Sequence, residues 1–82
     1  MGGWSLQYIP RPKPCFLDAQ DYLGAFSGEM RWRSKDKQRY YTWDRRHGEI
    51  EVFNSRGHHL GALDAQSGVL IKPPRKDRRL DV

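Results

Sequence analysis

Residues Tyr41–Phe53 are Y-T-W-D-R-R-H-G-E-I-E-V-F, and this stretch carries the clearest structural pattern of the chain. Carboxylate and apolar residues alternate from Glu49 to Asn54 with a period of two, which is typical of a strand with one face against a core. The preceding run Arg39–Trp43 is predicted to be another strand, and Gly48 interrupts the chain between them. The stretch therefore predicts two strands, with the run broken at Gly48.

The two faces of the second strand differ in character, because alternate side chains of a strand share a face. Ile50 and Val52 would point into the core. Glu49 and Glu51 would share the opposite face with Phe53. An exposed ring at this last position could stack on a nucleic-acid base.

Short strands continue on both sides of this pair at a spacing of roughly ten residues, which favours an antiparallel meander. No internal repeat is present. The further strands are predicted at Met30–Arg33, His59–Leu63 and Val69–Lys72, with turns at Ser34–Gln38, Ser55–Gly57 and Asp64–Gly68.

The residues before the first strand predict a helix. The pattern L-D-A-Q-D-Y-L-G-A-F would place Leu17, Tyr22 and Phe26 on the inner side of a short helix from Leu17 to Phe26, and Asp18 could cap its first turn. A helix followed by antiparallel strands gives an α+β fold, with a short N-terminal helix packed on a small antiparallel β-sheet.

Both ends of the chain have a composition unlike the middle. Residues 4–14 contain three prolines, which lack a backbone donor and predict an extended arm lying against the domain. Residues 72–82, K-P-P-R-K-D-R-R-L-D-V, form a basic tail that is predicted to be extended. We expect residues 1–82 to form one small domain.

Charge and cysteine content narrow the class of protein. The 82 residues have a formal net charge of +5, and residues 31–82 carry thirteen basic and seven acidic groups, a net charge of +6. A polyanionic partner is the natural inference, although a merely soluble basic surface has the same composition. Cys15 is the only cysteine. It is predicted to be a packing residue, and it excludes an internal disulfide and a cysteine-based zinc site. No apolar run approaches membrane-spanning length, and the N-terminus has no signal-peptide pattern.

Four residues of the quoted stretch could carry chemistry. Asp44, His47, Glu49 and Glu51 lie within eight residues, and a histidine among carboxylates can supply a general acid and a general base. On RNA, Glu51 would take the proton of a ribose 2′-OH, which attacks the adjacent phosphorus, and His47 would protonate the leaving 5′-oxygen. Asp44 could orient His47, while an arginine stabilises the phosphoryl oxygens. Neither a metal nor a cofactor is required.

The spacing of the acid and the base sets a geometric condition. On a straight strand His47 and Glu51 would be roughly 13 Å apart at the backbone. Their side chains can meet only if the chain bends or twists strongly near Gly48, which a glycine permits.

Each of these residues also has an ordinary structural explanation. A single strand glutamate is most often solvated and paired with Lys or Arg, and Asp44 could be only a turn former. His58 and His59 are interpreted as surface residues beside a turn, and Trp32 and Trp43 as core residues. A noncatalytic basic RNA-binding module, with aromatic rings stacking on bases, therefore remains an alternative.

Three segments together resemble a known family. They are W-R-S-K-D-K-Q-R-Y-Y-T-W-D-R-R-H-G-E-I-E at 32–51, H-L-G-A-L-D at 59–64 and S-G-V-L-I-K-P-P at 67–74. They resemble, in order and spacing, the cytotoxic ribonuclease domain of the ribosome-inactivating colicins. The resemblance covers residues 31–79, and the Y-x-P-x-P pattern of residues 8–12 is also similar.

The resemblance implies a role for each matching position. Phe53 stands where the family has tyrosine, and Arg78 falls on the family's C-terminal catalytic arginine when the tail is aligned without a gap, with Arg79 as the alternative. The implied catalytic residues are Asp44, His47, Glu51 and Arg78, and the implied substrate-binding residues are Tyr8, Glu49, Phe53, Lys72 and Arg79.

The resemblance also implies fold and function. The family fold is a short N-terminal helix beside a strongly twisted antiparallel sheet. The implied activity is metal-independent transesterification of 16S rRNA at the decoding site of the 30S ribosomal subunit, without a cofactor and with a 2′,3′-cyclic phosphate product. The implied partner is an acidic immunity protein, so that the domain would be a monomer or a toxin–immunity heterodimer. It would be exported as part of a larger toxin and act in the cytoplasm of the target cell; a ribonuclease acting on tRNA is the alternative enzyme.

Overall fold

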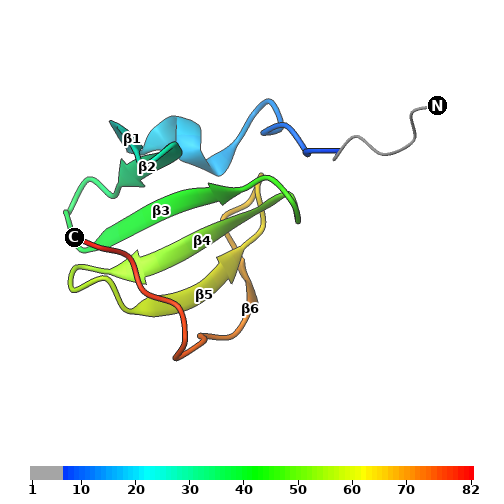
Figure 1. Ribbon diagram of the computed structural model, residues 1–82. Coiled ribbons are helices and arrows are strands. Elements are labelled where there is room, and N and C mark those ends of the chain that lie inside the picture. The colour runs from blue at the N-terminus through cyan, green and yellow to red at the C-terminus, as the bar shows by residue number, and fades with distance from the viewer. Residues whose placement is uncertain (1–6) are drawn as a thin grey trace.

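A computed structural model of the chain describes residues 7–82, and residues 4–6 of the predicted arm lie outside this range. The described chain forms one six-stranded antiparallel sheet whose strands follow each other in chain order, as the predicted meander requires (Figure 1). The elements are the 3-10 helix η1 (Phe16–Ala19) and the strands β1 (Asp21–Phe26), β2 (Glu29–Arg33), β3 (Arg39–Asp44), β4 (Glu49–Asn54), β5 (His59–Leu63) and β6 (Leu70–Lys72).

The predicted helix from Leu17 to Phe26 is wrong. Only the short turn η1 is helical there, and the rest of the segment is strand β1, paired with β2. Gly24 has a φ of +105°, and β1 has a bulge next to it, so this backbone does not continue as a right-handed helix. Ser27 and Gly28 form a two-residue hairpin turn with positive φ at both positions, which is typical of a type I′ turn.

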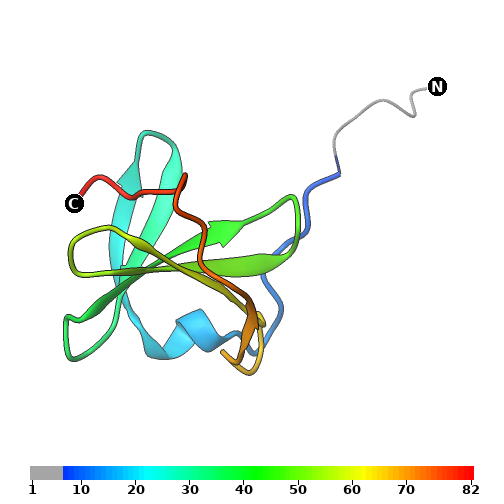
Figure 2. The same cartoon turned by 90° about the horizontal axis from the view of Figure 1, so that it is seen from below.

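The predicted α+β fold class is therefore wrong in its helical part, whereas the antiparallel sheet is confirmed. Within residues 7–82 no α-helix packs on the sheet, and no helix is long and apolar enough to span a membrane. Leu17 is buried, as predicted, because η1 lies against the core, whereas Tyr22 and Phe26 are 52% and 46% exposed. Strand direction turns markedly from the β1–β2 hairpin to the β4–β5 hairpin (Figure 2), as expected of a strongly twisted sheet.

Strand positions from β2 onward agree with the predictions to within one residue. Ile50 and Val52 on β4 are buried, as their alternation predicted. They belong to a core that also contains Cys15, Trp32 and Tyr41, so the packing role predicted for the cysteine is confirmed. Burial of these rings and branched chains is the main source of stability in so small a domain.

The C-terminal tail folds back over the β4–β5 hairpin instead of leaving the sheet (Figure 1). Arg79 forms an isolated antiparallel bridge with His58, and the backbone N–H of Leu80 donates to the carbonyl oxygen of Gly57 at 2.8 Å. The Leu80 side chain is 7% exposed. The tail thus covers part of the sheet face that carries Glu51.

Phe53 does not have the exposed ring that the sequence predicted. It is 2% exposed, because both faces of β4 are covered, one by the core and the other beneath the tail. A bulge between Val52 and Phe53 shifts the pairing with β5, and the ring packs edge-on against His59 with ring centroids 5.3 Å apart. Stacking of this ring on a base is therefore excluded while the tail is docked.

We expect Gly57→Ala to weaken the docking of the tail. A Cβ at Gly57 would lie 2.1 Å from the carbonyl oxygen of Leu80, a hard overlap with backbone. Gly28→Ala is the matched control, since the two glycines have similar φ values of +86° and +80° but nothing lies within 4 Å of a Cβ at Gly28. Urea unfolding should show that Gly57→Ala loses about 1–3 kcal/mol more than the control, the cost of overpacking; equal losses would contradict the tight contact.

Candidate active site

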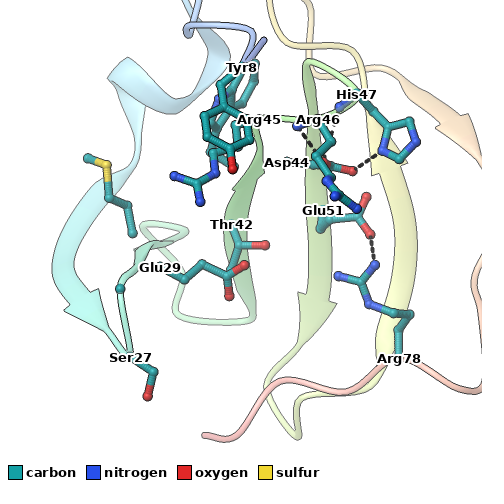
Figure 3. Close-up of a pocket in the computed structure, with 13 residues that line it drawn as sticks. Tyr8, Ser27, Glu29, Thr42, Asp44, Arg45, Arg46, His47, Glu51 and Arg78 are labelled. Carbon is teal, nitrogen blue, oxygen red and sulfur yellow. Dashed lines mark hydrogen bonds and ion pairs between the residues drawn. The ribbon is translucent and has the colours of Figure 1, made fainter. Parts of the chain in front are cut away.

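An open cavity of about 660 Å³ lies between the β1–β2 turn, the β3–β4 turn and the tail. It brings together the four predicted catalytic residues from two strands, one turn and the tail (Figure 3). The residues that line it are Tyr8, Ser27, Gly28, Glu29, Met30, Thr42, Trp43, Asp44, Arg45, Arg46, His47, Glu51 and Arg78.

Asp44, the last residue of β3, both builds the β3–β4 turn and holds His47. Its Oδ1 accepts hydrogen bonds from the backbone N–H groups of Arg46 and His47 at 3.1 and 3.2 Å, and its carbonyl oxygen accepts one from Gly48 at 2.8 Å. Its Oδ2 lies 2.7 Å from Nδ1 of His47. The turn-forming and the orienting interpretations of Asp44 are therefore compatible, because each carboxylate oxygen serves one of them.

The pKa of Asp44 is lowered, by the balance of two effects. Partial burial raises it, but the hydrogen bonds with the side chain and the backbone of His47 favour the charged carboxylate and prevail. This carboxylate consequently stays ionised at neutral pH and can hold the His47 ring with its Nδ1 proton toward Oδ2. The ring itself is at the rim of the cavity, where the side chain is 60% exposed.

Glu51 lies at the bottom of the cavity with a side chain only 8% exposed. Its Oε1 is 3.0 Å from Nε2 of His59 and 3.2 Å from Nη1 of Arg78. Glu51 pairs across the sheet with Thr42, and Glu49 pairs with Asp44, so all four residues share one face. The bend expected near Gly48 is present, because the chain reverses in the turn between β3 and β4 and Gly48 has a φ of +68°. His47 and Glu51 consequently line the same cavity.

Three carboxylates come close together in this arrangement. Single oxygen atoms of Asp44, Glu49 and Glu51 lie within 4.8 Å of one another, near enough to coordinate a divalent cation in geometric terms. Two of them are already paired with cationic side chains, since Glu49 lies 2.9 Å from Nζ of Lys72 and Glu51 contacts Arg78. The hydrogen bond to Glu49 raises the pKa of Lys72.

The remaining predicted residues lie around this centre. Tyr8 lines the cavity, and the guanidinium of Arg45 lies over its ring. The distance from Cζ of Arg45 to the centre of the Tyr8 ring is 3.9 Å. Lys72 and Glu49 pair with each other beside the cavity. Arg79 is outside it and lines a second, smaller cavity of about 330 Å³, to which Arg78 also belongs. The structure therefore brings Arg78, rather than its neighbour, to Glu51.

Sequence reasoning missed His59, which was interpreted as a surface residue. It is 7% exposed, and it bonds to Glu51 on one side and accepts the backbone N–H of Arg75 at 2.9 Å on the other. The sequence did offer one indication that His59 could contact Glu51, namely its position in the predicted hairpin. A residue opposite Phe53 lies diagonally from Glu51 on the same face. No local pattern predicted that the tail would bury this residue.

The described part of the N-terminal arm lies against the domain, as predicted. The backbone N–H of Ile9 donates to the carbonyl oxygen of Arg45 at 2.8 Å, and its own carbonyl oxygen accepts from Nε1 of Trp43 at 3.1 Å. A Cβ at Gly48 would touch the Ile9 side chain at 3.0 Å, so the glycine makes room for the arm. The arm thereby fixes the turn that carries His47.

We expect Asp44→Asn to destabilise the protein in a pH-dependent way. The amide oxygen can still accept the turn N–H groups, but the amide nitrogen cannot accept from His47, a loss of about 0.5–1.5 kcal/mol at pH 7. Because the folded-state pKa of Asp44 is lowered, its contribution is complete above the unfolded pKa and disappears as the pH falls below about 4.

Unfolding curves of the wild type, Asp44→Asn and Asp44→Ala at pH 7 and pH 3 would check this. The alanine variant should lose more at pH 7, because it also loses the acceptor for the turn. A difference between wild type and Asp44→Asn that is the same at both pH values would refute the assigned role of the charged carboxylate.

Comparison with known proteins agrees with the resemblance noted in the sequence. A family model described as "Cytotoxic" matches residues 18–81. The chain is 41% identical to cloacin of Escherichia coli over 58 residues, which is 70% of this chain and 10% of cloacin. It is 37% identical to colicin E3 of Escherichia coli over 51 residues, 61% of this chain and 9% of that protein. It is 35% identical to colicin-E6 of the same organism over 58 residues, which is 70% of this chain and 10% of colicin-E6.

The chain spans about a tenth of the length of these curated relatives. The family match includes the strands, the β3–β4 turn and the tail that form the cavity. The chain therefore belongs to the family of cytotoxic ribonuclease domains found in cloacin and the related colicins.

Proposed function

We propose that this domain is a cytotoxic endoribonuclease that cleaves 16S rRNA at the decoding site of the 30S subunit by metal-independent transesterification. The observation that carries the proposal is the shared cavity, in which the His47–Asp44 pair and the buried Glu51 with its partner Arg78 face the same space. Membership of the family supports the same activity.

Glu51 is the general base of the proposed reaction. It takes the proton of the ribose 2′-OH, and that oxygen attacks the neighbouring phosphorus to give a 2′,3′-cyclic phosphate. Two properties suit it to this role: its side chain is nearly excluded from water, and it opens into the cavity beside Arg78. A base held at a fixed place needs no rearrangement at the moment of attack.

His47 is the general acid, which protonates the leaving 5′-oxygen. Its Nδ1 is engaged by Asp44 at 2.7 Å, so Nε2 is the nitrogen available to the substrate. The carboxylate of Asp44 stabilises the imidazolium that must be present before the proton is given away. The exposed position of the ring at the cavity rim is consistent with access to a large substrate.

Arg78 stabilises the charge that develops on the phosphoryl oxygens. Its side chain is 41% exposed and reaches the cavity from the tail. A guanidinium is suited to this role because it can donate two parallel hydrogen bonds to phosphate. Tyr8, Glu49, Lys72 and Arg79 are proposed to contact substrate around this centre, whereas Phe53 is withdrawn from that role because its ring is buried.

The biological setting follows from the same proposal. The domain would be one part of a larger exported toxin, consistent with its covering about a tenth of its relatives, and it would act in the target-cell cytoplasm. An acidic immunity protein would be its partner in the producing cell, because a domain with a net charge of +5 offers such a protein a complementary surface.

We expect His47→Ala and Glu51→Gln to slow cleavage strongly while leaving RNA affinity nearly unchanged. Purified domain would be incubated with bacterial ribosomes in EDTA, and the RNA separated on a denaturing gel. The wild type should release one short 3′ fragment of 16S rRNA, and each variant should be slower by about 10²–10⁴-fold, the usual contribution of a general acid or base.

Asp81→Asn serves as the control, since it removes an exposed carboxylate of the tail outside the cavity. Intact 16S rRNA with wild-type domain would contradict the proposed substrate, and cleavage of tRNA in total RNA from intoxicated cells would then favour the other enzyme. If the wild type binds RNA without cleaving it, and the variants lose that binding, a noncatalytic RNA-binding module would be favoured.

We expect Arg78→Ala to reduce cleavage more than Arg79→Ala. Only Arg78 lies against Glu51 in the cavity, so its loss removes a donor to the phosphoryl oxygens, an effect of roughly 10²-fold or more in the rate at saturating substrate. Arg79→Ala should instead weaken binding, mainly at low salt. Initial rates at several ribosome concentrations would separate the two effects; equal losses of the maximal rate would assign the catalytic role to neither residue alone.

A further inference from the structure

His59 is a buried residue that lies behind the cavity rather than in it. Its side chain is 2% exposed, less than that of Glu51. The ring has hydrogen-bonding partners on both nitrogens, and its face is fixed by edge-on packing with Phe53. A histidine held in this way has one orientation.

The partner of Nδ1 decides where the ring carries its proton. The backbone N–H of Arg75 lies 2.9 Å from Nδ1, and a backbone N–H can only donate. Nδ1 must therefore accept with its lone pair, so the neutral ring has its proton on Nε2. That N–H points at Oε1 of Glu51, 3.0 Å away, and donates to it.

The two oxygens of Glu51 consequently differ. Oε1 accepts the Nε2–H of His59 and forms an ion pair with Nη1 of Arg78, 3.2 Å away. Within residues 7–82 no hydrogen bond to Oε2 is found, so this oxygen keeps its lone pairs for a ligand in the cavity. A carboxylate whose one oxygen is held by a rigid donor has its other oxygen aimed in a fixed direction.

We propose that His59 is a positioning residue that fixes Glu51 through Oε1 so that Oε2 accepts the substrate proton. It rests on the proposed function, since it needs Glu51 to be the general base. His59 does not touch the substrate. Through the Arg75 N–H it also connects the orientation of the base with the docking of the tail segment that carries Arg78.

A pair of amide variants separates the two hydrogen bonds of His59. In His59→Gln the amide nitrogen can occupy the place of Nε2 and still donate to Glu51. In His59→Asn the amide oxygen can occupy the place of Nδ1 and still accept from Arg75, but the shorter side chain leaves Glu51 without its donor. Both variants keep an uncharged polar side chain in the same buried position, so each tests one contact.

The maximal rate and the half-saturating ribosome concentration would be measured for both variants below their unfolding temperatures. We expect His59→Asn to lower the maximal rate by up to about 100-fold, the effect of a misplaced catalytic group, with half-saturation nearly unchanged. We expect His59→Gln to stay within about tenfold of wild type, since it retains the donor to Glu51.

Three results would overturn the inference: both variants close to the wild-type rate, both equally slow, or the glutamine variant slower than the asparagine variant. The last two would assign His59 to packing or to tail docking. Glu51→Gln measured beside them keeps this test separate from the proposed function. If Glu51→Gln cleaves like wild type, Glu51 is not the base; if it is inactive while His59→Asn is fully active, only the role of His59 fails.

Discussion

Burial of one charged carboxylate constrains the rest of this structure. Glu51 lies in the middle of β4, where its neighbours Ile50, Val52 and Phe53 are all buried. A carboxylate in such a place is costly unless cationic groups or hydrogen-bond donors meet it. Both of its partners depend on the tail, because Arg78 is part of it and the ring of His59 is anchored by it. The fold is thus complete only when the tail, residues 72–82, is docked.

The other half of the site depends on a different long-range contact. The turn from Asp44 to Gly48 presents His47 and is closed by Asp44 alone, but Ile9 from the arm bonds to Arg45 and to Trp43 across it. The proposed base and the proposed acid are therefore fixed from opposite ends of the chain. Since neither end belongs to the sheet itself, the sheet acts as a platform on which two otherwise irregular segments are brought together.

Local pattern was sufficient for the strands from β2 onward, and insufficient where distant segments decide burial; it also marked Asp44, His47 and Glu51 as candidates, whereas Arg78 was added only by the family resemblance. The period of two gave β4 and the inward side chains of Ile50 and Val52. The apolar spacing of Leu17, Tyr22 and Phe26 fitted a helix, yet the Ser-Gly turn that follows selects a hairpin. His59 and the ring of Phe53 were both predicted to be exposed. Both predictions failed because a tail with no strand pattern covers that face of the sheet.

The two partners of Glu51 differ in a way that suits a base. His59 is buried and hydrogen-bonded at both ring nitrogens, whereas the Arg78 side chain is 41% exposed and lines the cavity. In the free protein both partners contact Oε1 of the carboxylate. In the proposed complex Arg78, which lines the cavity, can also donate to the phosphoryl oxygens. His59 meanwhile keeps its hydrogen bond to the carboxylate. The buried glutamate thus serves the fold and, in the proposed mechanism, the chemistry.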